Sequence, residues 1–178
     1  VEELNLAKVL ELDQKTCFFL ALMEKNGIYL DKEKLNNFQQ QLVDQLKLLR
    51  EEIYQLAGKK FNLNSPIELR EVLFKHLRLP TKDLAKTPKG NISTQEAELI
   101  KIKDSHPIIV KILTYREIFK ILTTFTDSLV KYINPKTKRI HTSFDITGTA
   151  TGRIASFEPN LQNLPLEGGL AKKIRGCF

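Results

Sequence analysis

Uncharged hydrogen-bonding side chains gather around one arginine near the end of the chain. Within fifteen residues the sequence places Thr149, Thr151, Arg153, Asn160, Gln162 and Asn163. Side chains of these types can contact the minor groove of a nucleic-acid duplex, because every base pair presents acceptors there at purine N3 or pyrimidine O2. Threonine and asparagine also satisfy the backbone of their own turns. The residues alone leave a duplex contact and a self-contained loop both open.

No complete catalytic or metal-binding pattern accompanies this cluster. The three histidines lack metal-ligand spacing, and the sequence contains no Walker, Gly-x-Ser-x-Gly or His-Glu-x-x-His motif. Asp145 and Glu158 are the only acidic residues between positions 142 and 165. A two-metal site needs a clustered pair of carboxylates. We therefore expect structural roles for both acids, and neither a catalytic residue nor a metal ligand in this chain.

Charge is distributed unevenly along the 178 residues, which contain 28 Lys and Arg against 21 Asp and Glu. Residues 1–58 have a net charge of −3 and residues 59–178 a net charge of +10. A basic segment of this size favours a polyanionic partner, although an ordinary lysine-rich surface gives the same balance. The composition excludes collagen-like and disordered chains, and no apolar run approaches the ~20 residues of a membrane span.

Two long segments with narrow apolar seams predict an antiparallel helical hairpin. The first is expected to begin after the N-cap Asp31 and to end near Ala57, before Gly58. Its apolar positions repeat at steps of three and four: Leu35, Phe38, Leu42, Leu46, Leu49, Ile53 and Leu56. Ser105 and Pro107 open the second. Its apolar side is expected to comprise Ile108, Ile112, Leu113, Tyr115, Phe119, Leu122, Phe125 and Leu129. A compact helical bundle is the alternative, to which narrow seams are less suited.

A basic excursion separates the two long helices. Asn64 or Ser65 is expected to cap a short helix over residues 66–77. Ser93 and Glu96 have the spacing of a capping box, in which the hydroxyl and the carboxylate satisfy backbone donors reciprocally. The excursion would lie at the tip of the hairpin.

The remaining segments complete an α+β chain that is mostly helical. Residues 9–23 are expected to form a helix, which Asn26 and Gly27 stop. Residues 132–144 contain a turn between two apolar runs and predict a β-hairpin. The two cysteines lie 160 positions apart and are expected to be free thiols of a reducing compartment. We therefore expect a soluble, intracellular chain.

Two late motifs, TATGRI at residues 149–154 and EPNLQNLP at residues 158–165, precede Lys173-Ile174-Arg175. In this order and spacing they closely resemble the start of the palm in family A DNA polymerases, the bacterial DNA polymerase I family. Upstream motifs resemble the family's thumb: FNLNSP at 61–66, KTPKG at 86–90 and NPKT at 134–137. The resemblance covers nearly the whole chain.

The resemblance implies three parts. Residues 1–30 would lead into the thumb, residues 31–131 would form the thumb with a basic tip at about 59–104, and residues 132–178 would begin the palm. The implied activity is templated nucleotidyl transfer by a DNA-directed DNA polymerase in replication or repair, with Mg²⁺ as cofactor. The family's catalytic aspartates come later than Phe178. This chain alone is therefore expected to be inactive, as a fragment or as one piece of a divided polymerase.

The resemblance also implies contacts with a primer–template duplex. Minor-groove contacts are implied for Thr149, Thr151, Arg153, Asn160, Gln162, Asn163 and Arg175. Contacts with the DNA backbone are implied mainly for the thumb tip: Asn62, Asn64, Ser65, Lys86, Lys89, Asn91, Ser93, Thr94, Lys120 and Thr123. Lysine ammonium groups and free N–H groups at a helix N-terminus both suit phosphates.

The expected partners are primer–template DNA and the remaining polymerase segment, with fingers and catalytic palm, through which a dNTP would be bound. No membrane partner is expected. The implied location is the cytoplasm, as the bacterial nucleoid or a phage-infected cell, or else an organelle. A non-catalytic module for DNA binding or assembly, derived from a polymerase, is the alternative function.

Overall fold

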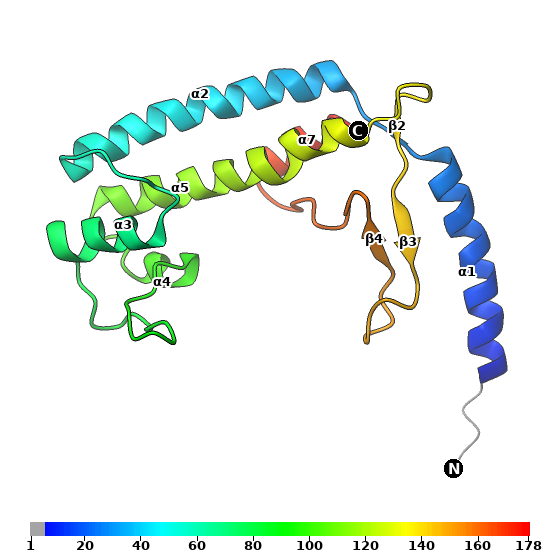
Figure 1. The fold of residues 1–178 in the computed structure, drawn as a ribbon, viewed down its shortest axis with the longest axis horizontal. Coiled ribbons are helices and arrows are strands. Elements are labelled where there is room, and N and C mark those ends of the chain that lie inside the picture. Colours follow the sequence, from blue (N-terminus) through cyan, green and yellow to red (C-terminus); the bar gives the residue numbers. More distant parts are fainter. Residues whose placement is uncertain (1–5) are drawn as a thin grey trace, which may run out of the picture. The chain divides into compact units, whose positions relative to one another are not determined.

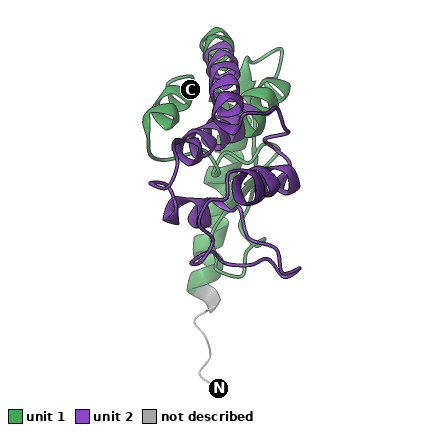
Figure 2. Ribbon diagram, turned by 90° about the vertical axis from the view of Figure 1, so that its left-hand side faces the viewer, with its two compact units in different colours: residues 1–39, 123–178 green, residues 40–122 purple. Residues whose placement is uncertain are grey.

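The computed structural model describes residues 6–178, with side-chain environments from residue 8 onward. Within these residues the chain is mainly helical and contains two small antiparallel sheets of two strands each, which confirms the α+β class (Figure 1). Unit 1 comprises residues 1–39 and 123–178, and unit 2 comprises residues 40–122 (Figure 2). None of the described helices is long and apolar enough to cross a membrane.

Unit 1 begins with helix α1 (Leu6–Asn26), which contains the helix predicted over residues 9–23. Strand β1 (Ile28–Tyr29) follows, and then helix α2 (Lys32–Ala57), which continues into unit 2. Asp31 caps α2 as predicted, because its Oδ1 accepts a hydrogen bond of 3.0 Å from the backbone N–H of Lys34. This bond is the main cause that lowers the pKa of Asp31.

Gly27 ends α1 in a conformation that favours glycine. Its φ is +61°, and its N–H donates to the carbonyl of Met23 at 2.8 Å. An added Cβ would lie 2.7 Å from the carbonyl oxygen of Ile140 and 2.9 Å from the ring of His141. Gly27→Ala is therefore expected to lower the free energy of unfolding by about 2–4 kcal/mol, through backbone strain and overpacking. Urea unfolding measures this loss.

Gly90→Ala is the matched control for Gly27→Ala. Gly90 also has a positive φ, +76°, but an added Cβ would meet no atom within 4 Å. This variant should lose only the backbone strain, about 1–2 kcal/mol. Equal losses in the two variants would contradict the close packing of Gly27 against residues 140 and 141.

One of the two strand pairs in unit 1 joins segments that are far apart in the sequence. β1 pairs with strand β2 (Arg139–Ile140), and strand β3 (Ser143–Asp145) pairs with strand β4 (Ala155–Phe157). The hairpin predicted over residues 132–144 is therefore only partly right. Its turn closes, since the N–H of Asn134 donates to the carbonyl of Arg139 at 2.9 Å, but a single bridge links its two sides. The strand that pairs with β2 lies 110 positions earlier, beyond the reach of local turn chemistry.

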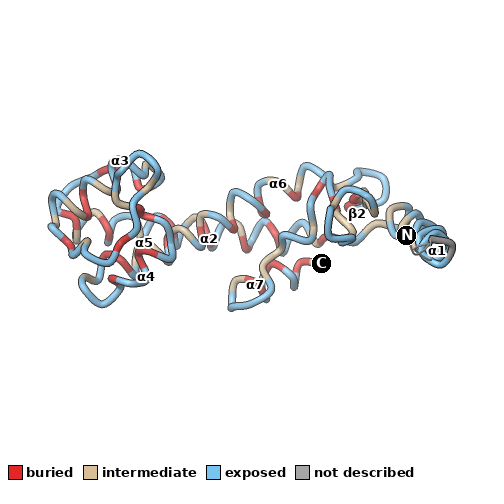
Figure 3. The backbone as a smooth tube through the Cα atoms, turned by 90° about the horizontal axis from the view of Figure 1, so that it is seen from below, coloured by how far each residue is buried: buried red, intermediate tan, exposed pale blue. Residues whose placement is uncertain are grey.

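In unit 2, residues 40–57 of α2 and helix α5 (Pro107–Ile121) lie antiparallel and side by side (Figures 1 and 3). Leu42, Leu46 and Ile53 of the predicted seam are buried. An ion pair of 2.7 Å between Lys111 Nζ and Glu52 Oε2 joins the two helices at their exposed edge. This part of the predicted helical hairpin is confirmed.

The buried face of α5 differs from the prediction. Ile109, Ile118 and Ile121 are also buried, whereas the predicted Leu113, Phe119 and Leu122 are only half-buried. Helix α4 (Glu96–Lys101) packs against α5. The N-cap of α5 is His106, whose Nδ1 accepts a hydrogen bond of 3.2 Å from the N–H of Ile108. The prediction that Ser105 opens this helix is therefore wrong.

Helical structure continues after α5, but it is not regular. A π-helical turn at Leu122–Thr126 is followed by α6 (Asp127–Leu129) and a 3-10 turn at Val130–Tyr132. The sequence thus predicts how far this second long helical segment extends. It does not predict the change from α-helical to π-helical and 3-10 hydrogen bonding. In the final stretch, helix α7 (Gly169–Arg175) follows β4, and the sequence predicts neither element.

The excursion contains helix α3 (Pro66–Arg70), which continues as a π-helical turn at Glu71–His76. Of the two capping candidates, Ser65 is the cap: its Oγ accepts a hydrogen bond of 3.3 Å from the N–H of Glu68. The capping box predicted at the start of α4 is wrong. The Oγ of Ser93 instead accepts from the N–H of Gln95 at 3.2 Å, so it closes a tight turn before the helix begins.

Both cysteines are free thiols, as predicted, but their surroundings differ. Cys17 is exposed on α1, whereas Cys177 is only 3% exposed. The carbonyl of Cys177 accepts a hydrogen bond of 2.7 Å from the N–H of Asp31, which ties the end of the chain to the start of α2. Burial, and to a smaller extent the negative charge of Asp31, raise the pKa of the Cys177 thiol.

Candidate nucleic-acid interface

The cluster of polar side chains around Arg153 lies on and after the loop that joins β3 to β4 in unit 1. Asp145 opens this loop: its Oδ1 accepts hydrogen bonds from the backbone N–H groups of Thr147, at 2.7 Å, and Gly148, at 3.0 Å. These bonds, the one from Thr147 foremost, lower the pKa of Asp145. Asp145 therefore anchors its own loop, the structural role expected from the sequence.

Arg153 lies two residues before β4, and its side chain is exposed. Its guanidinium makes no hydrogen bond or ion pair with another described residue, so its five N–H donors face solvent. The preceding turn is closed by the N–H of Gly152, which donates to the carbonyl of Thr149 at 3.3 Å. Thr151 and Arg175, the latter in the last turn of α7, are exposed too.

The side chains of Thr149 and Gln162, for which the resemblance implies minor-groove contacts, hydrogen-bond to the backbone beside Arg153. The Oγ1 of Thr149 donates to the carbonyl of Arg153 at 2.7 Å. The Nε2 of Gln162 donates to the carbonyl of Ile154 at 2.7 Å, and its Oε1 accepts from the N–H of Ser156 at 3.1 Å. Both side chains are therefore already engaged within the protein.

Asn160 organises the segment that follows β4. Its Oδ1 accepts hydrogen bonds from the N–H groups of Gln162, at 3.0 Å, and Asn163, at 3.3 Å. Asn160 and Asn163 are exposed, and both line a cavity of about 280 Å³ together with Ser128 and Tyr132. The structure thus brings all predicted minor-groove residues except Arg175 onto one continuous segment, residues 149–163.

A second group of predicted residues lies in unit 2, on the loop between α3 and α4. Lys86 and Ile92 form an antiparallel bridge, and the N–H of Thr87 donates to the carbonyl of Asn91 at 2.7 Å. The side chains of Lys86, Lys89 and Asn91 are exposed. The loop is therefore a small ordered hairpin that presents two ammonium groups and one amide to solvent.

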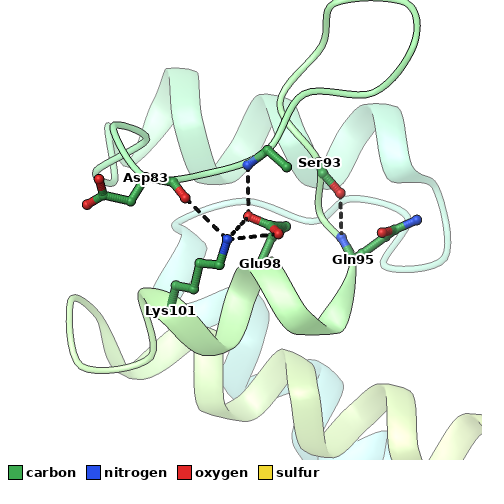
Figure 4. Close-up of polar contacts among 6 residues, drawn as sticks. Asp83, Ser93, Gln95, Glu98 and Lys101 are labelled. Carbon is green, nitrogen blue, oxygen red and sulfur yellow. Dashed lines mark hydrogen bonds and ion pairs between the residues drawn. The ribbon is translucent and has the colours of Figure 1, made fainter.

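Glu98 of α4 holds the base of this loop. Its carboxylate accepts hydrogen bonds of 2.8 Å from the N–H of Ala85 and from the Nζ of Lys101 (Figure 4). Lys101 also donates to the carbonyl of Asp83 at 3.3 Å. The loop is thereby fastened to α4 at Asp83 and Ala85.

Ser93 and Thr94, predicted as backbone contacts, are buried, with 5% and 7% of their surfaces exposed. The hydroxyl of Ser93 is bound to Gln95, and the carbonyl of Thr94 accepts a short hydrogen bond from the guanidinium of Arg116. The hydroxyl of Ser93 and the backbone carbonyl of Thr94 are thus engaged just before α4 begins.

The other predicted contacts at the start of the excursion are also partly engaged. The Oδ1 of Asn62 accepts from the N–H of Asn64 at 2.9 Å, and Ser65 is the cap of α3. Asn64 is exposed but hydrogen-bonds to Tyr115; burial raises the pKa of that tyrosine and the bond opposes the increase.

Lys120 and Thr123 are both exposed, but they fall in different units, Lys120 in unit 2 and Thr123 in unit 1. Within unit 2, Lys86, Lys89 and Asn91 come together on the ordered hairpin of residues 86–92.

The lowered pKa of Glu98 predicts a pH-dependent contribution to stability. The bonds from Lys101 and from the N–H of Ala85 favour the ionised carboxylate. The stabilisation is therefore complete above the ordinary pKa of 4.5 and is lost as the pH falls through the lower pKa of the folded state. Glu98→Gln is expected to flatten the pH dependence of the free energy of unfolding between about pH 5 and pH 3. Urea titrations across this range measure it.

Glu96→Gln is the control for this titration, because Glu96 is exposed on the same helix. It should retain the pH dependence of the wild-type chain. A Glu98→Gln variant with the same profile as the wild type would show that the carboxylate does not support the loop.

Ser156 is a contributor to the site that the sequence analysis missed. It is 3% exposed, its N–H binds Gln162, and its Oγ donates to the Oδ1 of Asn160 at 3.3 Å. The signal available in the sequence was a serine at the central, inward-facing position of the short strand 155–157. Because the sequence did not predict that strand, it could not show that Ser156 is buried.

Comparison with known proteins gives one consistent result. A family model described as DNA polymerase family A matches residues 32–178. The thermostable DNA polymerase I of Thermus thermophilus is 43% identical over 169 residues, which are 94% of this chain and 20% of that polymerase. DNA polymerase I of Geobacillus stearothermophilus is 41% identical over 168 residues, 94% of this chain and 19% of that polymerase. The chain spans about a fifth of the length of these relatives.

A solved structure is similar as well. It is the POL domain of Pol1 from M. smegmatis in complex with DNA primer-template and dNTP. The TM-score is 0.80 at 36% sequence identity, and the match covers 89% of this chain and 28% of that chain.

Proposed function

The chain belongs to DNA polymerase family A, and on this basis we propose that it is the duplex-holding part of a DNA-directed DNA polymerase. Residues 31–131 are the thumb in this proposal, residues 132–178 begin the palm, and residues 1–30 lead into the thumb. The observation that carries the proposal is the similarity, at a TM-score of 0.80, to a polymerase domain in complex with DNA primer-template and dNTP.

The two exposed groups of residues supply different contacts in this proposal. Arg153 reaches the minor groove at the primer end, and Thr151, Asn160, Asn163 and Arg175 make further minor-groove contacts. Because purine N3 and pyrimidine O2 occupy similar positions in every correct pair, a guanidinium donor there senses the shape of the pair and not its sequence. Lys86 and Lys89 bind phosphates, which holds the duplex without reading it.

Nucleotidyl transfer is assigned to sequence other than these 178 residues. Family A polymerases use Mg²⁺, which supplies charge stabilisation for the transferred phosphoryl group. Among the described residues there is no group of three or more side chains that could hold a metal ion. We assign to this chain the binding and orientation of the duplex.

The proposal is tested in a chimeric polymerase, in which this chain replaces the matching segment of the Geobacillus stearothermophilus enzyme. Primer extension with Mg²⁺ and four nucleotides is compared for this chain alone and for the chimera. Extension by the chimera and not by the isolated chain supports the proposal. A folded chimera that binds duplex DNA without extending it favours a non-catalytic binding module. Extension by the isolated chain would overturn the assignment of catalysis to other sequence.

A further inference from the structure

Two consecutive carbonyl groups, those of Arg153 and Ile154, are each held by a side chain from a different side of the loop. The hydroxyl of Thr149 donates to the first at 2.7 Å, and the amide of Gln162 donates to the second at 2.7 Å. The Oε1 of Gln162 also accepts from the N–H of Ser156, at 3.1 Å. The backbone that follows the Cα of Arg153 is therefore held at two consecutive carbonyl groups.

Two of the three hydrogen-bond donors on Thr149 and Gln162 are already bonded to backbone carbonyl groups. The minor groove presents mainly acceptors, so a residue that reads it must offer N–H or O–H groups. Thr149 has one O–H, which is bound to the carbonyl of Arg153. Gln162 has two N–H groups on its amide, one of which is bound to Ile154, while its oxygen is bound to Ser156. A direct contact of Thr149 with a base acceptor would require it to release the backbone.

Thr149 and Gln162, which hold the carbonyl groups of Arg153 and Ile154, form what we call the clamp. The clamp is connected to the buried part of unit 1. Ser156 is 3% exposed and lies opposite Phe144 in the β3–β4 pair. Its Oγ binds Asn160, whose Oδ1 in turn receives the N–H of Gln162 at 3.0 Å. The paired strand thus fixes the position of Gln162 through Ser156 and Asn160. Gln162 in turn holds the carbonyl of Ile154.

We propose that Thr149 and Gln162 are positioning residues that fix the backbone at and after Arg153 for its minor-groove contact, and that they act through Arg153. This inference rests on the proposed function of Arg153. Arginine loses much rotational freedom when it binds, so a fixed backbone leaves only its side chain to be ordered. Displacement of such a group by about 1 Å can cost about 100-fold in rate.

Thr149→Val, Thr149→Ser and Gln162→Ala, each in the chimeric polymerase, test the clamp. Single-turnover incorporation and duplex dissociation constants are measured for each. Thr149→Val and Gln162→Ala should lower the incorporation rate about 10-fold or more, with less than about threefold change in duplex affinity. Thr149→Ser retains the donor and should restore most of the rate. Thr114→Val is the matched control, because Thr114 also donates to a backbone carbonyl, that of Val110, but on α5.

Combination with Arg153→Ala separates positioning from direct contact. If the two residues act through Arg153, adding Thr149→Val or Gln162→Ala to Arg153→Ala lowers the rate little further. If they contact the duplex, their effects multiply with that of Arg153→Ala and duplex affinity falls, which overturns the inference. If Arg153→Ala itself leaves the rate unchanged, the proposed function of Arg153 fails, and the inference fails with it. A Thr149→Ser variant as slow as Thr149→Val also overturns the clamp.

Discussion

Replacing Arg153 with alanine in the chimeric polymerase is expected to lower the rate of nucleotide incorporation about 10- to 100-fold, which is the range of one or two charge-assisted hydrogen bonds. Duplex affinity should fall by less than about threefold, because phosphate contacts elsewhere supply most of the binding energy. The exposed guanidinium has no internal partner to release, so the loss reports on contacts made outside this chain. Single-turnover kinetics and equilibrium titration with labelled duplex measure the two effects.

Lys131→Ala is the control for Arg153→Ala. It removes an exposed positive charge from the same unit without touching the β3–β4 loop. Its rate and affinity should stay within about twofold of those of the parent chimera. An Arg153→Ala variant that loses rate and affinity equally, or that loses neither, would contradict a role in sensing the primer terminus.

The joint replacement of Lys86 and Lys89 with alanine has the second largest expected effect. It should weaken the affinity for duplex DNA. In a plot of the logarithm of duplex affinity against the logarithm of salt concentration, the slope should become less steep by about 2. At 0.15 M salt the affinity should be up to roughly 30-fold weaker, which is the contribution of two released counterions. The loss should be the same for duplexes of different sequence, because phosphates carry no sequence information.

Lys131 and Lys136, replaced together, provide the control. Both are exposed and lie outside residues 59–104, and their removal changes the net charge equally. Titrations with the isolated chain at several salt concentrations compare the two double variants. An equal reduction of the slope in both would indicate a diffuse electrostatic attraction rather than a site on the 86–92 hairpin. An unreduced slope after the loss of Lys86 and Lys89 would remove these residues from the interface.

Local signals in the sequence predicted the parts of the fold that local chemistry determines. Asp31 caps α2 and Ser65 caps α3 because the interacting groups lie three residues apart. The seam of α2 followed from its spacing. The pairing of β1 with β2 could not be predicted in this way, since strands of two residues have no usable period and their partners are 110 positions apart.

The sequence predicted which residues form the candidate site, but not how their side chains are arranged. The sequence contains Arg153 and its polar neighbours, but it cannot show that Thr149 and Gln162 turn inward to the backbone. The same limit applies to α4. Ser93 and Glu96 have the spacing of a capping box, yet Glu98 is the carboxylate that a backbone N–H engages, and that donor belongs to the loop residue Ala85. The choice between local and distant partners depends on tertiary packing.

The contrast between the two thiols makes the chain suitable for attaching a single reporter. Cys177 is buried, its Sγ donates to the carbonyl of Lys173 at 3.4 Å, and its raised pKa keeps it in the poorly nucleophilic thiol form at neutral pH. Cys17 is exposed on α1, away from the candidate interface residues in sequence. A maleimide dye should therefore label the unmodified wild-type chain once, at Cys17. Binding of the labelled chain to duplex DNA can then be measured without introducing or removing any cysteine.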